Sequence, residues 1–277
     1  MTKVFNGRNP VSPRNGVSEA SSKEKVGRRS FLKALAAAVT AAAALRLSQR
    51  ATKASEPVGS SPHKWAMVID QGKCVGCGYC TLACRAHNDA PPSISWNKVI
   101  PAGKVGNREV FLPRPCQHCE HAPCVEVCMV GASYHRADGI VMMDYDKCIG
   151  CRYCEVACPY GARAFNWEAF TGPNPVVPMW GEPEVERRPR GVPEKCSFCY
   201  QRIDRGLALG LKPGVDPEAT PACVVACPMK ARAFGDLNDP ESEVSRLLAA
   251  HSSYRLREDL GTAPRVYYLP ARQEVSG

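Results

Sequence analysis

The sequence lacks the short motifs by which several large enzyme classes are identified. It has no glycine-rich phosphate-binding loop, no dinucleotide-binding fingerprint and no convincing pair of a nucleophile with a base. It also lacks a long apolar run, because its one alanine-rich stretch, residues 34–45, is shorter than the roughly 20 residues that span a bilayer. We therefore expect no direct small-molecule substrate, and we expect any membrane attachment to come from a partner or an uncleaved leader.

Acidic residues are nearly missing from the first 54 positions. Those positions hold 11 Lys and Arg against 2 Asp and Glu, whereas the rest of the chain holds 25 of each. The net charge of +9 is therefore a property of the N-terminal segment, and the remainder is formally neutral. A nucleic-acid-binding face would need its positive charge in the folded part of the chain, so we expect no nucleic-acid partner.

The N-terminal segment has the parts of an export signal. A basic, polar start is followed by GRRSFLK at residues 27–33 and then by the apolar residues 34–45. The paired Arg28 and Arg29 before Phe-Leu-Lys resemble the twin-arginine signal. We therefore expect residues 1–54 to be a leader and the protein to be periplasmic, with its membrane association through a partner. A basic surface helix is the alternative, and the site of cleavage stays open.

Cysteine, in contrast, is abundant, with 16 residues in four groups of four. The first three groups occupy CVGCGYCTLAC, CQHCEHAPCVEVC and CIGCRYCEVACP, and the fourth is split between CSFC and CVVACP. In chain order the groups are Cys74, Cys77, Cys80 and Cys84; Cys116, Cys119, Cys124 and Cys128; Cys148, Cys151, Cys154 and Cys158; and Cys196, Cys199, Cys223 and Cys227. Nothing is left over, which predicts sites that each use four thiols.

Three kinds of site compete for this pattern. Disulfides are common in exported proteins, but a C-x-x-C-x-x-C run brings three thiols towards one point, whereas a disulfide framework separates its partners. Zinc is usually held by two C-x-x-C pairs, which leaves the third and fourth cysteines and the following proline unexplained. The run C-x2-C-x2-C-x3-C-P is the spacing of bacterial ferredoxins, whose [4Fe–4S] clusters take one thiolate at each iron corner. The four motifs therefore predict four [4Fe–4S] clusters, with a zinc-stapled exported interaction scaffold as the alternative.

The first and third groups are copies of one another, displaced by 74 residues. WAMVIDQGKC precedes the first and GIVMMDYDKC the third, and each predicts a short strand that leads into a cluster loop. Alanine recurs at the same offset behind the last cysteine of three groups, as Ala132, Ala162 and Ala231. These repeats indicate a duplicated ferredoxin-like unit. Three stretches, residues 85–115, 171–195 and 200–222, are predicted to be insertions.

The Pro-rich insertion 171–195 is predicted to run over the surface, because proline cannot continue a helix or a central strand. It is either a plain connection or a docking surface for a partner subunit. Its charged residues predict a solvated surface of mixed charge; they are Glu182, Glu184, Glu186, Arg187, Arg188 and Arg190.

Together these motifs resemble the four-cluster iron–sulfur subunits of membrane-bound respiratory oxidoreductases, over residues 65–270. The leader makes the chain similar to the exported members, such as the iron–sulfur subunits of tetrathionate reductase, of formate-dependent nitrite reduction and of the sulfite-reduction-associated transmembrane complex. The resemblance implies an α+β fold of duplicated dicluster ferredoxin-like modules with loop insertions. It also implies an electron-transfer subunit, not an enzyme itself, between an integral membrane quinone-interacting subunit and a molybdopterin or multihaem redox subunit. The terminal substrate and the direction of electron flow stay open.

The resemblance further implies which cysteines share a cluster, because the family pairs its first motif with its fourth and its second with its third. Carried over by position, set 1 is Cys74, Cys77, Cys80 and Cys227; set 2 is Cys84, Cys196, Cys199 and Cys223; set 3 is Cys116, Cys119, Cys124 and Cys158; and set 4 is Cys128, Cys148, Cys151 and Cys154. One departure is Met129, which follows Cys128 where the family pattern has proline and is expected to alter the start of the next turn. A reductase that used one cluster as its active site would need an iron corner without a protein ligand, and 16 cysteines for four cubes leave none.

The predicted organisation is a leader, residues 1–54, followed by a four-cluster domain, residues 55–277. The parts of that domain are module A at about 62–100 plus 190–240, module B at about 111–170, the Pro-rich insertion 171–195 and a C-terminal tail 241–277. Two histidines inside the second motif are expected to donate or accept hydrogen bonds near a cluster rather than to ligate it, namely His118 and His121. Three tyrosines beside the motifs are expected to shield clusters from water, namely Tyr79, Tyr153 and Tyr160.

Overall fold

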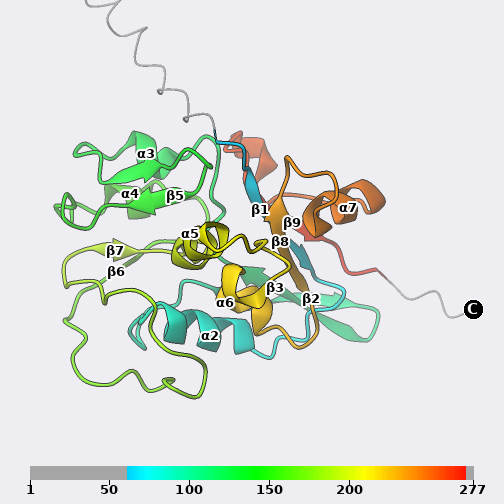
Figure 1. Ribbon diagram of the computed structural model, residues 1–277, viewed down its shortest axis with the longest axis horizontal. Coiled ribbons are helices and arrows are strands. Elements are labelled where there is room, and N and C mark those ends of the chain that lie inside the picture. Colours follow the sequence, from blue (N-terminus) through cyan, green and yellow to red (C-terminus); the bar gives the residue numbers. More distant parts are fainter. Residues whose placement is uncertain (1–60, 273–277) are drawn as a thin grey trace, which may run out of the picture. The chain divides into compact units, whose positions relative to one another are not determined.

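The computed structural model describes residues 61–272, which form a mixed α+β structure of short elements (Figure 1). The predicted leader, residues 1–54, and the Arg28–Arg29 pair lie outside the described residues. Within the described part of the chain, no helix is long and apolar enough to cross a membrane.

The central sheet has three strands in the order β8-β1-β9. Strand β1 (Trp65–Asp70) pairs antiparallel with β8 (Arg232–Asp236) and parallel with β9 (Val266–Leu269). Five consecutive residues of β1, from Trp65 to Ile69, are buried, which is why the strand reads as a continuous apolar run and not as an alternation. The predicted strand before the first motif is therefore confirmed, and the C-terminal tail contributes a strand of its own to the same sheet.

Helices follow the first and fourth cysteine motifs. Helix α2 (Tyr79–His87) begins inside the first motif, and α5 (Tyr200–Ala208), the 3-10 turn η1 (Pro217–Ala219) and α6 (Ala222–Val225) belong to the fourth. Helices α2 and α6 contact one another, and α5 packs on η1, where the absence of a side chain at Gly206 lets the backbone approach Ala219. Helix α7 (Glu243–Ala250) packs on β8 and β1, and the Ser242 hydroxyl accepts the Ser245 N–H at its start.

The second and third motifs carry smaller elements. Helix α3 (Pro123–Glu126) contacts α4 (Tyr153–Val156), and a two-stranded ladder joins β4 (Ser133–His135) to β5 (Val141–Met143). In Figure 1 this group of elements lies on the far side of α5 from α2. Strand β5 confirms the second strand predicted from the repeat. A further short ladder joins β6 (Ala164–Phe165) to β7 (Pro193–Glu194), and η2 (Glu258–Leu260) precedes β9.

The three predicted insertions differ in structure. Residues 85–115 contain a β-hairpin of β2 (Lys98–Val105) and β3 (Arg108–Arg114), whose tip is exposed. Residues 171–192 contain neither helix nor strand, as their prolines predict. Residues 200–222, in contrast, begin with α5, which buries Arg202, Ile203 and Gly206. This stretch is thus part of the packed structure and not only a surface loop.

Candidate iron–sulfur sites

All sixteen cysteines lie within the described residues, and all are free thiols. Most are buried or partly buried, and only Cys77 and Cys151 are exposed. Because none of the sixteen cysteines forms a disulfide, the disulfide alternative is excluded. No three His, Cys, Asp or Glu side chains within residues 61–272 come close enough together to hold a single metal ion.

Two of the thiol sets each line a cavity. The first cavity is lined by the four cysteines of set 1, together with Gly76, Gly78 and Arg232. The second is lined by the four cysteines of set 3, together with Tyr160 and Arg163. In both cavities three thiols come from one motif and the fourth comes from another, Cys227 in the first case and Cys158 in the second.

The other two sets are recognised from the mutual influence of their thiols. Burial raises the pKa of Cys84, and the nearby charges of Cys196, Cys199 and Cys223 raise it further. Burial also raises the pKa of Cys154; Arg163 opposes the shift, and the charges of Cys124 in set 3 and of Cys128 and Cys148 in set 4 add to it. The structure thus brings thiols of different motifs together in both sets, with Cys151 in the exposed loop between Cys148 and Cys154.

Several N–H groups already point at the sulfur atoms. The backbone N–H of Ser133 donates to Cys128 Sγ at 3.2 Å, and that of Ala231 donates to Cys227 Sγ at 3.3 Å. Ser133 follows the recurring alanine of the second motif, and Ala231 is itself the recurring alanine of the fourth. Each therefore reaches the last cysteine of its motif. The side-chain amide of Asn88 lies 3.8 Å from Cys84 Sγ and 3.7 Å from Cys199 Sγ, two members of set 2. Hydrogen bonds to sulfur are among the factors that set cluster potentials.

The buried thiols are suited to metal binding, because burial keeps them protonated unless a metal takes the place of the proton. Burial raises the pKa of Cys119 to about 12 and that of Cys223 to about 12. A buried thiol of this kind becomes a thiolate when a metal replaces its proton, since coordination deprotonates a thiol outright. Four such groups around one cavity, three of them from a single loop, match the donor set of a [4Fe–4S] cluster.

The loops can turn tightly around these cavities because key positions adopt left-handed backbone conformations. Gly76 has φ of +73°, and a Cβ there would lie 2.6 Å from the Phe111 ring. Gly150, its counterpart in the third motif, has φ of +70°, and a Cβ there would lie 2.4 Å from the Gly191 carbonyl oxygen. Glycine is thus required twice over in each copy, for the dihedral angle and for space.

The histidines and tyrosines of the motifs do not behave alike. His118 is fully buried, its Nδ1 accepts the Val141 N–H at 3.1 Å, and burial holds its pKa well below the ordinary value, so the ring is neutral. Its Nε2 has no hydrogen-bond partner among the described residues, whereas His121 is exposed. Tyr160 is buried and contacts Thr262 through its hydroxyl. Tyr79 and Tyr153 are 42% and 57% exposed, so the shielding expected of them stays a prediction.

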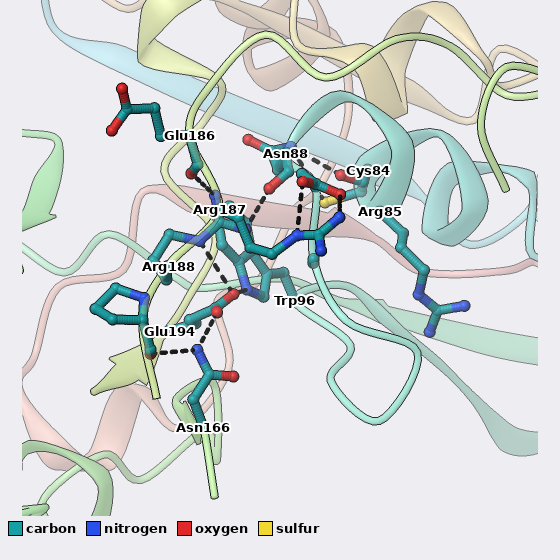
Figure 2. Close-up of polar contacts among 12 residues, drawn as sticks. Cys84, Arg85, Asn88, Trp96, Asn166, Glu186, Arg187, Arg188 and Glu194 are labelled. Atoms are coloured by element: carbon teal, nitrogen blue, oxygen red, sulfur yellow. Dashed lines mark hydrogen bonds and ion pairs between the residues drawn. The ribbon is translucent and has the colours of Figure 1, made fainter. Parts of the chain in front are cut away.

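The charged residues of the Pro-rich insertion are not uniformly solvated either. Figure 2 shows Arg188 between Asn88 and Glu194: its guanidinium donates to the Asn88 carbonyl and lies 3.4 Å from Glu194 Oε2. Glu194 is completely buried and also accepts from Trp96 Nε1 at 2.9 Å and from Asn166 Nδ2. The expectation of a solvated mixed-charge surface is wrong for Arg188, which is buried against Asn88 and Glu194, whereas Glu182, Glu186 and Arg190 are exposed as expected.

Through this network the Pro-rich insertion holds Asn88, whose side chain contacts two cysteines of set 2. Arg188 holds the backbone of Asn88, and the Asn88 side chain reaches Cys84 (Figure 2). The same side chain also reaches Cys199. Arg187 strengthens the attachment through Asp89, at 2.8 Å from Oδ2 and 3.0 Å from Oδ1. Asn88 was not predicted from the sequence, and no motif in the sequence marks it.

The turn after Cys128 also departs from expectation. Gly131 N–H donates to the Cys128 carbonyl at 3.1 Å, and the equivalent bond from Gly161 to Cys158 is 3.2 Å although Pro159 replaces Met129 there. The missing proline therefore leaves the turn unchanged, because residues other than proline also adopt this conformation.

The chain is similar to known iron–sulfur proteins. A family model described as a 4Fe–4S dicluster domain matches residues 108–172, and a 4Fe–4S binding domain matches residues 65–86. One subunit of the selenate reductase from Mesobacillus selenatarsenatis is 45% identical over 221 residues, 74% of this chain and 72% of that protein. The menaquinone reductase iron–sulfur cluster-binding subunit of Nitratidesulfovibrio vulgaris is 41% identical over 76% of this chain and 91% of that protein. One subunit of the tetrathionate reductase from Salmonella typhimurium is 36% identical over 76% of this chain and 74% of that protein.

These matches agree with the cysteine pattern and the cavities. The two cluster-binding models cover the first three cysteine motifs, and the relatives span most of both chains. They favour iron–sulfur clusters over the zinc-stapled scaffold. The chain belongs to the family of [4Fe–4S] iron–sulfur subunits of respiratory oxidoreductase complexes, and within that family it is an electron-transfer subunit and not the catalytic one.

Proposed function

We propose that the four thiol sets each hold one [4Fe–4S] cluster, as the cysteine motifs and the resemblance predict. The observation that carries this assignment is the pair of cavities lined by sets 1 and 3, in which one thiol of each quartet comes from a different motif. Each cluster takes up and releases one electron when bound. The protein supplies the thiolates, the hydrogen bonds to sulfur and the burial that together set the potentials.

The effects of the thiols on one another's pKa values support one linear order. The charge of Cys80 in set 1 raises the pKa of Cys84 and of Cys223 in set 2, and the charge of Cys116 in set 3 raises the pKa of Cys196 in set 2. The charge of Cys124 in set 3 raises the pKa of Cys154 in set 4. Neighbouring pairs are therefore 1 with 2, 2 with 3, and 3 with 4, and electrons would pass along the row in that order or its reverse.

The two ends of this row are the places where electrons would enter and leave. Sets 1 and 4 contain the two exposed cysteines, Cys77 and Cys151, whereas every cysteine of set 2 is buried. Exposed apolar side chains surround both ends; those at set 1 include Val75 and Met229, and those at set 4 include Ile149 and Val156. Apolar surface beside a terminal cluster suits contact with another redox subunit, because it excludes water from the transfer path.

We propose that one end faces an integral membrane quinone-interacting subunit and the other a molybdopterin or multihaem redox subunit. The names of the relatives support this, because they include a menaquinone reductase subunit and reductase subunits for selenate and tetrathionate. The paired Arg28 and Arg29 support export to the periplasm by the twin-arginine pathway, which carries folded proteins. The protein would then be held at the membrane through its partner.

The structure also supports the proposed duplication. Module A would consist of the elements around the β8-β1-β9 sheet with α2, α5 and α6, and module B of α3, α4, β4 and β5. The strand before the motif recurs as β1 and β5, and the turn glycine recurs as Gly76 and Gly150. The dicluster model covers residues 108–172, close to the proposed bounds of module B.

Metal and sulfide analysis of the intact complex tests the proposal. Four clusters predict about sixteen iron and sixteen acid-labile sulfide per chain and a broad visible absorbance that bleaches on reduction. Mass spectrometry of the same preparation should identify a membrane subunit and a second redox subunit. Zinc in place of iron, with no visible absorbance, would overturn the proposal.

A further inference from the structure

Three cationic side chains lie in the interior among the cysteines without a carboxylate partner. Arg163, Lys195 and Arg232 are 4%, 2% and 5% exposed. Their hydrogen bonds go to neutral acceptors: backbone carbonyls, a serine hydroxyl, an asparagine amide oxygen, thioether sulfur and one cysteine sulfur. None of the three forms an ion pair with Asp or Glu among residues 61–272.

A buried charge without a partner is costly, by several kcal/mol for each ion, so these cations need an anion that is not a carboxylate. Glu194 precedes Lys195 in the chain, but its oxygens are engaged by Arg188, Trp96 and Asn166. A [4Fe–4S] cluster with four thiolates is anionic, because the thiolates outweigh the positive charge of the core, and it gains a further negative charge on reduction. The clusters are thus the natural counter-ions.

Each cation lies between two consecutive sets. Arg232 lines the cavity of set 1 and donates to Cys223 Sγ of set 2 at 3.7 Å. Lys195 donates from Nζ to the carbonyl of Cys196 in set 2 at 2.8 Å and to the carbonyl of Val141, a residue that lines the cavity of set 3.

The third cation repeats this arrangement between sets 3 and 4. Arg163 lines the cavity of set 3 and donates to the Ser133 hydroxyl, and the Ser133 N–H reaches Cys128 Sγ of set 4 at 3.2 Å. The two arginines occupy equal positions in PYGARAF and PMKARAF, a signal that the sequence contained.

We propose that Arg232, Lys195 and Arg163 each neutralise the junction between two consecutive clusters and so raise the reduction potentials of both. The inference rests on the proposed ligand sets. A fixed cation stabilises the more negative, reduced state of a cluster more than the oxidised state, since the Coulomb energy scales with the charge it faces. One positive charge at every junction holds all four clusters in a range where an electron can pass from each to the next. The step itself transfers one electron and moves no proton.

Lys195 is the sharpest case, because the chain contains two matched controls. Lys73 and Lys147 also precede the first cysteine of a motif, but their side chains are 55% and 65% exposed and pair with Asp70 and Asp144. The dipeptide Lys-Cys is therefore the same in all three places, and only the burial and the counter-ion differ. Water screens the exposed pairs, so their charges act weakly on a cluster.

The test is a reductive titration of the cluster-loaded complex followed by electron paramagnetic resonance, after the four signals have been assigned with single cysteine variants. Lys195→Gln is expected to lower the reduction potentials of the clusters of sets 2 and 3 by at least about 59 mV, which is a tenfold change in the one-electron reduction equilibrium. The potentials of the clusters of sets 1 and 4 should shift less. Lys73→Gln and Lys147→Gln should leave all four within that limit. Unchanged potentials in Lys195→Gln, or an equal shift of all four, would overturn the inference.

Variants of the two arginines provide a second test if the Lys195→Gln protein does not assemble its clusters. Arg163→Gln should lower the potentials of sets 3 and 4 and Arg232→Gln those of sets 1 and 2, whereas Arg163→Lys and Arg232→Lys keep the charge and should retain the parental values. Loss of iron in the glutamine variants with full iron in the lysine variants also supports a requirement for charge. Equal loss in both kinds of variant would show a packing role and refute the proposal. Fewer than four clusters in the parent complex would instead count against the proposed function.

Discussion

At the scale of single residues, the turn after the last cysteine of a motif shows how far its structure depends on one residue of the motif. Met129 stands where the third and fourth motifs have proline, yet the turn closes with the same hydrogen bond as at Pro159. The proline is therefore not needed to form the turn. What it changes is the unfolded chain, because a fixed φ leaves fewer conformations to lose on folding.

Met129→Pro is accordingly expected to stabilise the protein, by about 0.4 to 1 kcal/mol. Met129 is exposed, and its N–H donates to no backbone carbonyl among the described residues, so the ring removes no such hydrogen bond. Thermal unfolding of the cluster-loaded protein measures the effect. Val130→Pro serves as the control, since proline is disfavoured at the third position of such a turn and should destabilise. A lower unfolding temperature for Met129→Pro would show that the turn differs from that at Pro159.

At the scale of elements, local patterns were predicted and long-range pairings were not. The strands β1 and β5 follow from the repeated apolar approach to the first and third motifs. Strand β9 falls within the predicted tail, because its parallel pairing of Val266 with Met67 joins residues far apart in the sequence. Helix α5 falls within a predicted insertion, although its apolar and polar residues recur with helical period, a pattern that indicates a helix.

The Pro-rich insertion is attached to the end of α2 by charges that no local pattern indicates. Asp89 accepts two hydrogen bonds from Arg187 and one from Asn174, and Glu184 pairs with Arg202 of α5 at 2.6 Å. Burial alone would raise the pKa of Asp89, but these hydrogen bonds outweigh it and hold the pKa below its ordinary value. The attachment is thus strongest when Asp89 is ionised.

Asp89→Asn is therefore expected to loosen residues 171–190 at neutral pH. The asparagine tolerates the left-handed conformation of position 89, where φ is 41°, so the change removes mainly the charge. A charged hydrogen bond contributes about 1.5 to 3 kcal/mol, which predicts at least a tenfold loss of amide exchange protection in this segment. Asp259→Asn, in an ion pair with both side chains more than half exposed, should change protection little.

The pH dependence of the same segment follows from the sign of the shift. Because the folded pKa of Asp89 is lowered, its contribution is complete above the ordinary aspartate pKa of about 3.9 and is lost as the pH falls through the folded value. Glu184 contributes in the same direction, since its pKa is also lowered. Exchange protection, corrected for intrinsic rates, should fall in the parent below about pH 4. Protection in Asp89→Asn that equals the parent at pH 7 would contradict this account.

At the scale of the whole molecule, the cysteine arithmetic was the most informative part of the sequence. Four groups of four predicted the class of cofactor, and the relatives confirm an iron–sulfur electron-transfer subunit. The buried cations Arg163, Lys195 and Arg232 were missed, because charged residues next to motifs are usually solvated and their burial depends on the packing of elements far apart in the sequence. The row of clusters could be proposed from the sequence only through the family resemblance.

Export is tested most directly at the arginine pair. Changing both Arg28 and Arg29 to lysine keeps the charge of the leader and removes the bidentate guanidinium groups that distinguish the twin-arginine signal. We expect the variant to accumulate inside the cell with its clusters assembled, as measured by fractionation and visible absorbance. Changing Lys23 and Lys25 to arginine is the matched control and should leave export intact. Normal export of the Arg28→Lys, Arg29→Lys variant would contradict the proposed route.

The central claim, that each cluster draws one thiolate from a different motif, is tested by one comparison. Cys158→Ser should eliminate or alter the paramagnetic signal of the cluster held by Cys116, Cys119 and Cys124, because Cys158 lines that cavity. Cys128→Ser should instead affect the cluster of the third motif. If Cys158→Ser changed only the cluster held by its own neighbours in CIGCRYCEVACP and left the other signal intact, the pairing of motifs would be wrong.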